Sequence, residues 1–251
     1  MSATTYLFVP GDRPERFAKA VASGADVVIL DLEDAVAAAD KDVARAHVGA
    51  WLDAGGRAMV RINAPGTPWF GSDVDVLAHY AVPVMVPKAE NPGALSEFRE
   101  VTALVETALG VERAAELAAV ASVRRLAFGA VDLAAQLGVD PADREVFAYA
   151  RSRLVLASAA AGLEPPVDGV TTDLTDPDRL LSDVRYARRL GFGAKLCVHP
   201  KQIDVVRAGF APTEAELEWA RKIITAGESV STVDGEMVDR PVLERARRLL
   251  G

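Results

Sequence analysis

The sequence predicts an α/β fold, a single (β/α)8 TIM barrel with a C-terminal helical lid extension. Short apolar runs of the β type recur roughly eight times. They occupy residues 6–9, 27–30, 58–62, 84–86, 103–105, 126–128, 167–170 and 195–198. Segments with helical spacing lie between these runs, so strand and helix alternate, which is typical of a parallel sheet. A doubly wound open sheet is the alternative, but no GxGxxG motif follows the first run, and this number of strands favours closure.

Helical spacing is found in residues 16–22, 42–52, 94–100, 113–119, 147–160 and 180–190. No low-complexity linker divides the chain of 251 residues, so one domain is expected. Its barrel would span residues 1–212 and its extension residues 213–251. The extension contains a helical run, a glycine-containing connector at 233–237 and a further short helix. Such an appendage can close over its own barrel or over that of a neighbour.

Composition narrows the class of protein. With 28 basic and 36 acidic side chains, the formal net charge of -8 argues against nucleic acid as a partner. The chain carries no basic N-terminal targeting segment and no apolar stretch long enough to cross a bilayer. Its single cysteine, Cys197, excludes an internal disulfide. We therefore expect a cytoplasmic protein with no membrane partner.

Polar side chains follow most of the predicted strands. In a closed α/β barrel, reactive groups stand at the carboxyl ends of the strands and in the loops that follow. The residues at these places are Asp31, Glu33, Asp34, Arg61, Asn63, Lys88, Glu106, Asp132 and His199. The chain has too few histidines and cysteines for a zinc site, and converging carboxylates favour a hard cation such as Mg2+.

Two carboxylates of this set are candidate metal ligands. Glu106 follows an apolar run directly, although it could instead be a capping or salt-bridged carboxylate. Asp132 follows Gly129 where a helix should begin, so its alternative role is that of a helix N-cap. Together, on adjacent strand ends, they predict a metal pair.

Two cations complete the predicted mouth of the barrel. Arg61 ends the third run, and its guanidinium suits a substrate carboxylate or a developing oxyanion, with a surface salt bridge as the alternative. Lys88 follows the fourth run and pairs either with a phosphate or with a neighbouring acid such as Glu33.

The turn at residues 9–14 combines Gly11, Arg13 and a proline at a predicted helix start. Such a loop could hold a phosphate through backbone N–H groups and Arg13. His199 precedes a proline, which favours a turn role over direct chemistry. Cys197 is expected to point into the barrel interior as a small apolar side chain.

These residues stand in motifs that resemble one family from end to end. The chain resembles the citrate lyase beta-subunit-like proteins of the aldolase/citrate lyase, CoA-ester lyase superfamily. The motifs are LFVPGDRPERF at 7–17, VILDLEDAV at 28–36, RIN at 61–63, VPKAE at 86–90, VET at 105–107, FGAVDL at 128–133, VHPKQI at 198–203 and GEMVDRP at 235–241.

The resemblance implies a role for each matching residue. Glu106 and Asp132 correspond to the family's Mg2+ ligands, and Arg61 to the arginine that binds a 2-oxo acid. The backbone of Gly129, Ala130 and Asp132 would hold the carboxylate of that acid. The acyl-CoA end would be met by Arg13, Lys19 and Lys88.

The resemblance also implies an oligomer. In CoA-ester lyases of this kind, an aspartate of the C-terminal lid reaches the site of an adjacent subunit, typically in a trimer, and Asp239 occupies that motif. Glu33 and Asp34 join Arg61 and Asp239 as candidate catalytic residues. Leu109 and Val131 stand where the family often has arginine and glutamate, which changes the surroundings of the metal ligands.

The expected reaction is Mg2+-dependent cleavage, or formation, of a 3-hydroxyacyl-CoA such as malyl-, citramalyl- or citryl-CoA, with a 2-oxo acid and an acyl-CoA as the other partners. One alternative is a citrate lyase beta subunit that acts on a carrier-bound citryl thioester with partner subunits. Another is a barrel that binds a 2-oxo acid without turnover.

Overall fold

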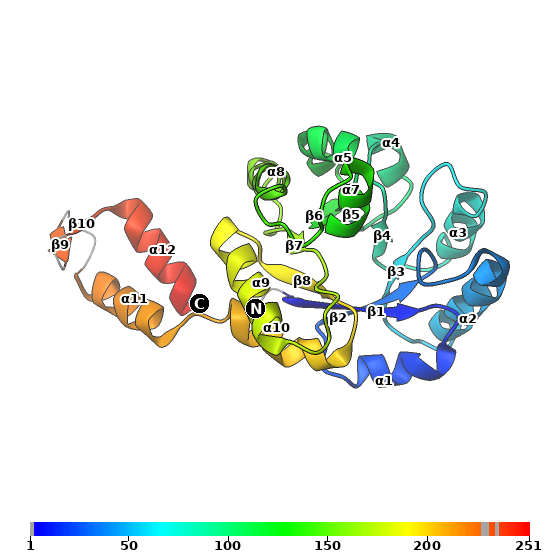
Figure 1. Ribbon diagram of the computed structural model, residues 1–251, viewed down its shortest axis with the longest axis horizontal. Coiled ribbons are helices and arrows are strands. Elements are labelled where there is room, and N and C mark those ends of the chain that lie inside the picture. Colours follow the sequence, from blue (N-terminus) through cyan, green and yellow to red (C-terminus); the bar gives the residue numbers. More distant parts are fainter. Residues whose placement is uncertain (1–2, 227–230, 234–235) are drawn as a thin grey trace. The chain divides into compact units, whose positions relative to one another are not determined.

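The computed structural model describes residues 3–226, 231–233 and 236–251. The chain forms two compact units, Ser2–Phe210 and Ala211–Gly251. The first unit is a closed barrel of eight parallel strands surrounded by helices (Figure 1). The predicted (β/α)8 barrel is confirmed, and the open sheet is excluded because β1 pairs with both β2 and β8.

Each of the predicted apolar runs overlaps one strand of the barrel. The strands are β1 Thr5–Pro10, β2 Val27–Asp31, β3 Met59–Arg61, β4 Val84–Val86, β5 Val101–Val105, β6 Val123–Phe128, β7 Val167–Asp168 and β8 Ala194–Cys197. The seventh strand is the shortest, because only Val167 and Asp168 of the predicted run pair with their neighbours.

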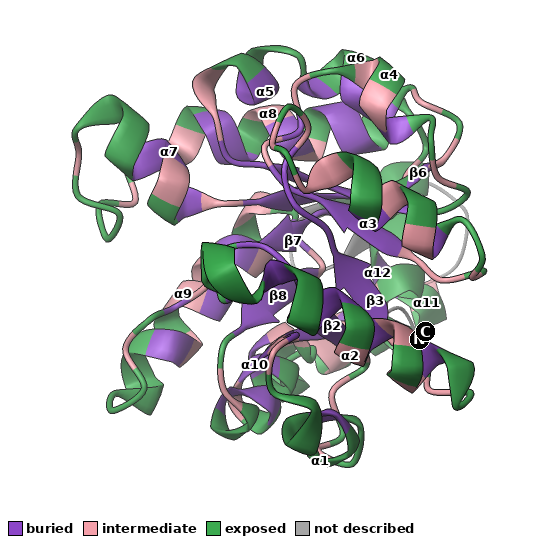
Figure 2. Cartoon of the chain, turned by 90° about the vertical axis from the view of Figure 1, so that its right-hand side faces the viewer, coloured by how far each residue is buried: buried purple, intermediate pink, exposed green. Residues whose placement is uncertain are grey.

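Alternate residues of each strand face two different cores, as the two-residue period of a strand requires. One core fills the barrel interior and contains Tyr6, Ile29, Met59, Met85, Leu104, Ala127, Val167, Ala194 and Leu196. The other lies between strands and helices, and both are buried (Figure 2). Cys197 belongs to the outer core, so its predicted place in the barrel interior is wrong. Its neighbour Leu196 takes the inward position.

The helices that surround the barrel pack against this outer core. They are α1 Phe17–Val21, α2 Lys41–Asp53, α3 Phe70–Leu77, α4 Pro92–Leu95, α5 Ala108–Glu112, α6 Ala114–Ala118, α7 Ala130–Leu137, α8 Ala148–Ala160, α9 Pro177–Leu190 and α10 Ile203–Phe210, with short 3-10 turns at Pro14–Arg16, Ala38–Asp40 and Pro200–Gln202.

The helix predicted at residues 94–100 is wrong. Asn91 caps a helix that begins at Pro92, and this helix ends at Leu95. Leu95 and Phe98 both pack on the core, which produced a helix-like spacing. After Leu95 the chain turns, with Phe98 N donating to the carbonyl of Leu95 at 3.4 Å, and the carbonyl of Glu100 then accepts a hydrogen bond from Val84 N of β4 at 2.9 Å.

The second unit contains α11 (Glu214–Ala226), the antiparallel strands β9 (Ser231–Val233) and β10 (Glu236–Val238), and α12 (Arg240–Leu250). Parts of the predicted connector at 233–237 are therefore strand, while Asp234 and Gly235 lie outside the described residues. Among the described helices of the chain, none is both long and apolar enough to cross a bilayer.

Candidate active site

A pocket of about 390 Å³ opens at the carboxyl ends of the barrel strands, a volume in the range of small-molecule sites. Its lining residues lie in or just after β1, β2, β3, β5, β6, β7 and β8. The residues are Phe8, Pro10, Asp31, Asp34, Ala35, Arg61, Leu104, Glu106, Phe128, Gly129, Ala130, Val131, Asp132, Val170, Leu196 and Val198.

Arg61 is the central cation of this pocket. Asp31 and Arg61 are direct neighbours on the adjacent strands β2 and β3, and both occupy the inward parity of Ile29 and Met59. Arg61 donates two hydrogen bonds to Asp31, Nε to Oδ1 at 2.7 Å and Nη2 to Oδ2 at 2.6 Å. The ring of Phe8 lies 4.6 Å from the guanidinium carbon. Arg61 is buried, so the surface salt bridge proposed as its alternative is excluded.

The remaining Nη1 group of Arg61 faces two further acids. It lies 3.0 Å from Glu33 Oε2 and 3.8 Å from Asp34 Oδ2. Burial would lower the pKa of Arg61, but the charges of Asp31 and Glu33 raise it above its usual range, so the guanidinium stays charged. Asp34 is half exposed and lines the pocket, whereas Glu33 is buried beside it.

Lys88 joins Glu33 to the predicted metal ligands. Its Nζ lies 2.6 Å from Glu33 Oε1, which confirms the acid pairing, and 3.9 Å from both Glu106 Oε1 and Asp132 Oδ1. Burial acts to lower the pKa of Lys88, but the hydrogen bond and charge of Glu33 raise it. The backbone of Lys88 adopts a left-handed conformation, with φ of 47°, and its N–H donates to Glu106 Oε1 at 2.9 Å.

Glu106 is buried among other carboxylates. Burial, followed by the charges of Glu33 and Asp132, raises the pKa of Glu106 from 4.5 to about 8, against the opposing charge of Lys88. Because its surroundings disfavour the ionised form of Glu106, a bound cation would stabilise that form. Glu106 is therefore more than a surface salt-bridge partner.

Asp132 stands in the first turn of α7, two residues inside the helix. The N-cap is Gly129, so the N-cap role proposed as the alternative for Asp132 is wrong. Within the described residues, no group of three or more carboxylate, imidazole or thiolate side chains is arranged to hold a metal. Two carboxylates are what Mg2+ often takes from a protein, with water and substrate oxygens completing its shell. The donor set of Glu106 and Asp132 fits this ion.

Gly129 is packed against Glu106 so closely that a side chain cannot fit. A Cβ atom at this position would meet the Cβ and the Oε2 atom of Glu106. We expect Gly129→Ala to push the Glu106 carboxylate aside and to weaken Mg2+ binding by at least about tenfold, as shifts around metal ligands do. Titration calorimetry with Mg2+ checks this. Gly71→Ala is the control, because a Cβ there meets nothing within 4 Å; equal affinity in both variants would contradict the expectation.

The residues predicted for the acyl-CoA end are not gathered in the pocket. Arg13 and Lys19 are exposed, and neither belongs to the lining. The N–H groups of Gly11 and Arg13 already donate to the backbone carbonyls of Asp31 and Pro10, at 2.8 and 3.1 Å. These two N–H groups therefore cannot cradle a phosphate in this conformation, and the side chain of Arg13 lies 3.8 Å from Asp12 Oδ2.

Asp239 belongs to the second unit of the chain. It is the N-cap of α12, where its Oδ1 atom accepts a hydrogen bond from Val242 N at 3.2 Å. One oxygen of the carboxylate thus caps the start of α12. The role of Asp239 in a neighbour's site stays a prediction.

Two residues at strand ends prove structural. Asn63 is buried and donates from both its N and Nδ2 atoms to Asp73 Oδ2, at 2.8 and 2.7 Å. His199 caps the turn at Pro200–Gln202, where Nδ1 accepts from Lys201 N at 3.1 Å, which confirms its turn role.

The sequence analysis missed three charged residues near the seventh and eighth strands. Asp168 lies between Arg151 Nε, at 2.9 Å, and Lys195 Nζ, at 3.0 Å. Asp168 and Lys195 are direct neighbours on β7 and β8. The available signal was a charged residue inside each apolar run, because such charges are rarely buried without a partner.

Of the two departures from the family pattern, only Val131 lines the pocket. Leu109 lies on α5, and both side chains are exposed. Val131 therefore puts an apolar group beside Asp132 where the family often has a carboxylate.

Comparison with known proteins places this geometry in a family. The profile of the HpcH/HpaI aldolase/citrate lyase family matches residues 4–200. A citrate lyase subunit beta-like protein of Mycobacterium tuberculosis is 44% identical over 257 residues, which cover 98% of this chain and 93% of that protein. A (3S)-malyl-CoA thioesterase of Cereibacter sphaeroides is 34% identical over 263 residues, which cover 97% and 92%.

A crystal structure of CitE from Mycobacterium tuberculosis in complex with magnesium, acetoacetate and coenzyme A superposes with a TM-score of 0.91. It is 43% identical, and the match covers 99% of this chain and 97% of that chain. A second structure, described as citrate lyase beta subunit complexed with oxaloacetate and magnesium from the same organism, has a TM-score of 0.77 at 44% identity, covering 84% and 98%. The matched residues, the identity and the shared barrel show that the chain belongs to the HpcH/HpaI aldolase/citrate lyase family.

Proposed function

We propose that the protein is a Mg2+-dependent carbon–carbon lyase that cleaves or forms a 3-hydroxyacyl-CoA, with a 2-oxo acid and an acyl-CoA as the other partners. The observation that carries the proposal is the pocket in which burial, together with the charges of Glu33 and Asp132, raises the pKa of Glu106 to about 8 beside the fixed cation Arg61. Relatives that bind magnesium with an oxo acid, and in one case coenzyme A, support the ligand classes.

Glu106 and Asp132 would hold the metal. Bound Mg2+ would act as a Lewis acid toward the oxygens of the hydroxy-acid end. The N–H groups of Ala130 and Asp132 in the first turn of α7 would meet the carboxylate of that acid at the positive end of the helix, whereas the N–H of Gly129 already donates to the carbonyl of Val105 at 3.0 Å. Lys88, tied to Glu33, would keep the carboxylates of the metal site from repelling one another.

Asp34 is our candidate for the base, because its carboxylate is half exposed, lines the pocket and lies near Arg61 without a hydrogen bond to it. Asp34 would take the proton of the substrate hydroxyl, whose O–H electrons then form the carbonyl of the 2-oxo acid. The carbon–carbon bond breaks, and its electron pair passes to the thioester enolate. Arg61 would stabilise the oxygen that carries charge, and Glu33 would hold Arg61 and Lys88 in position.

The enolate needs a proton donor, and we propose Asp239 of a neighbouring subunit for this step. In this proposal the unit Ala211–Gly251 acts as a lid in a homo-oligomer, with a trimer as the form that the family resemblance implies. Arg13, which precedes the 3-10 turn Pro14–Arg16, and Lys19 on α1 are exposed and would meet the phosphates of coenzyme A.

The test is Mg2+-dependent cleavage of malyl-, citramalyl- and citryl-CoA by the purified full-length chain, with Glu106→Ala and Asp132→Ala as matched variants. We expect a 2-oxo acid to be released from at least one thioester and the release to fall by at least about a hundredfold in both variants. Release that is unchanged without metal, or unchanged in both variants, would sink the proposal.

Thioester hydrolysis is the second candidate, because relatives 34% identical over nearly the whole chain are named (3S)-malyl-CoA thioesterase. The same assay separates the two: hydrolysis releases a free thiol without a 2-oxo acid, whereas cleavage releases the oxo acid without a thiol. Turnover only with a carrier-bound citryl group would instead favour a citrate lyase beta subunit, and oxo acid binding without any turnover a non-catalytic barrel.

A further inference from the structure

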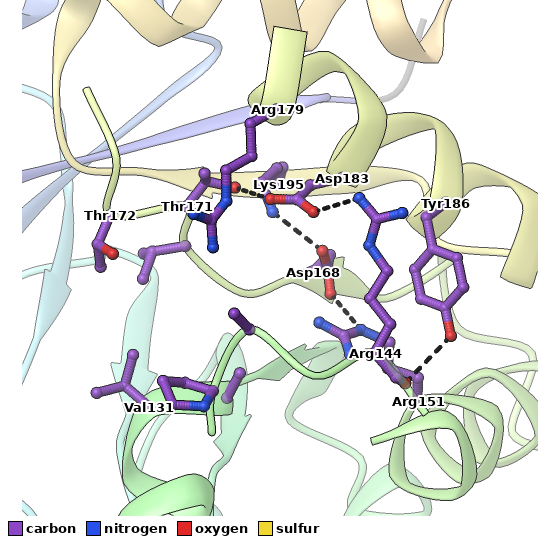
Figure 3. A pocket seen from close by; sticks show the side chains of 14 residues that line it. Val131, Arg144, Arg151, Asp168, Thr171, Thr172, Arg179, Asp183, Tyr186 and Lys195 are labelled. Atoms are coloured by element: carbon purple, nitrogen blue, oxygen red, sulfur yellow. Dashed lines mark hydrogen bonds and ion pairs between the residues drawn. The ribbon is translucent and has the colours of Figure 1, made fainter. Parts of the chain in front are cut away.

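A second cavity, of about 480 Å³, lies beside the barrel wall, between α7, α8 and α9 (Figure 3). It adjoins the candidate active site, because Ala130, Val131 and Val170 line both. Its floor contains Asp168 and Lys195, which take the outward parity of their strands, opposite to Val167 and Ala194 in the barrel interior. The cavity thus belongs to the layer between strands and helices.

The floor of this cavity carries a buried excess of positive charge. Asp168 is the only carboxylate between Arg151 Nε, at 2.9 Å, and Lys195 Nζ, at 3.0 Å, among the groups that the described structure places in contact with it. Burial alone would raise the pKa of Asp168, but the charges of Lys195 and Arg151 hold it below its usual value, so the carboxylate is ionised. One negative and two positive charges leave a net charge of +1.

Arg151 is fixed by contacts with its neighbours, but only one of its N–H groups donates a described hydrogen bond. Its side chain is 10% exposed. The guanidinium carbon lies 4.7 Å from the ring of Phe128 and 5.8 Å from that of Tyr186. Within the described part of the chain, Arg151 donates a hydrogen bond only from Nε, to Asp168. Its terminal amino groups are therefore left for another acceptor, on a side chain that lines the cavity.

The rim adds further positive charge. Asp183 is satisfied by Arg144, at 2.7 Å, and by the hydroxyl of Thr171, at 2.8 Å. Arg179 lines the cavity, and its guanidinium lies beside Thr171 (Figure 3). Asp173 does not line the cavity. Its charge interacts with that of Arg179, but solvent screens this interaction. Four cations thus face two carboxylates in the lining, a net charge of +2.

We propose that this cavity is a binding site for a small dianion that carries phosphate or carboxylate oxygens. A buried net charge is unfavourable until an opposite charge compensates it, and a guanidinium fork fits two oxygens of either group. The anion would lie between the amino groups of Arg151 and Arg179, with the hydroxyl of Thr172 as a further donor in the lining. The proposal does not depend on the reaction at the metal site.

The test uses titration calorimetry on the full chain without Mg2+, with inorganic phosphate in one arm and succinate in the other. Arg151→Met keeps an unbranched side-chain stem but removes the guanidinium and its charge, and Arg179→Ala removes the exposed cation. Arg185→Ala, on the same helix α9 but outside the lining, is the matched control. Arg13→Ala and Lys88→Ala report on binding at the other predicted anion sites.

We expect at least one of the two anions to bind, with affinity reduced about tenfold or more in Arg151→Met and at least about threefold in Arg179→Ala, as lost charge-assisted hydrogen bonds require. Arg185→Ala, Arg13→Ala and Lys88→Ala should bind as the unaltered chain does. The anion with the higher affinity, inorganic phosphate or succinate, shows whether the site prefers a phosphate or a carboxylate group.

The proposal is overturned if neither anion binds, if affinity is unchanged in Arg179→Ala, or if it is lost in Arg13→Ala or Lys88→Ala. If Arg151→Met does not fold, Arg179→Ala decides alone, because Arg179 is exposed and its only described hydrogen bond, to Asp176, comes from the backbone N–H that alanine keeps. Lyase activity measured in parallel tests the proposed function separately, so that failure of one proposal can be told from failure of the other.

Discussion

Glu106→Gln is expected to abolish Mg2+ binding and, at pH 8 without metal, to raise the free energy of unfolding. The pKa of Glu106 is about 8 in the folded protein against 4.5 for an ordinary glutamate. Below pH 4.5 the group is protonated in both states and its contribution to stability is fully present. As the pH rises toward 8, the unfolded chain loses the proton while the folded chain keeps it, so stability is lost. The whole effect is on the order of 5 kcal/mol.

Glutamine avoids this loss because it cannot ionise, yet its Oε1 atom can still accept the hydrogen bond from Lys88 N. Denaturant unfolding at pH 5, 6.5 and 8 in a metal chelator checks the prediction. The unaltered protein should lose stability across this window, and Glu106→Gln should lose much less. Adding Mg2+ should stabilise the unaltered protein alone.

The exposed Glu97 supplies the control, because Glu97→Gln removes a carboxylate that is in contact with solvent. If Glu97→Gln and Glu106→Gln changed the pH dependence equally, the buried position of Glu106 would not be its cause. A variant Glu106→Gln that still bound Mg2+ with unchanged affinity would remove it from the metal site.

Arg61→Met should have two large effects. The first is a loss of about 3 to 5 kcal/mol in the free energy of unfolding, because Asp31 is 1% exposed and would lose its bidentate partner. The second is a fall in lyase turnover of roughly a hundredfold or more, the cost of removing a donor that stabilises developing charge. Thermal or denaturant unfolding and the thioester assay measure the two effects.

The double variant Arg61→Met with Asp31→Asn separates stability from catalysis. Neutralising Asp31 should recover part of the stability, since no buried charge is left unpaired there, while turnover should stay low. Arg61→Lys should restore the charge but not the two parallel hydrogen bonds, so its turnover should fall between those of the other forms. Normal turnover in Arg61→Met would exclude the proposed role of this residue.

The sequence by itself determined the fold class and the position of most of the polar residues at the mouth of the barrel. Alternating apolar runs and helical segments require a parallel sheet, and in a closed barrel the carboxyl ends of all strands meet at one rim. Position in the chain was therefore enough to bring Asp31, Asp34, Arg61, Glu106 and Asp132 into one pocket. Arg13 precedes the first 3-10 turn and Lys19 lies on α1, and their position in the sequence did not decide what they contact.

Only the tertiary structure decided how these groups interact. The bidentate pair of Arg61 and Asp31 joins residues 30 positions apart, and it depends on the register of β2 against β3. The raised pKa of Glu106 depends on burial and on the charges of Glu33 and Asp132, which no sequence pattern measures.

The same reason explains what the sequence analysis missed or misplaced. Asp168 and Lys195 stood inside apolar runs, and only the strand parity shows that they point outward to meet Arg151 from α8. The prediction that Cys197 faces the barrel interior was likewise wrong, because the sequence does not show the strand parity that turns this side chain to the outer core. Local patterns establish elements and their ends, whereas burial and contacts between distant residues are set by how those elements pack.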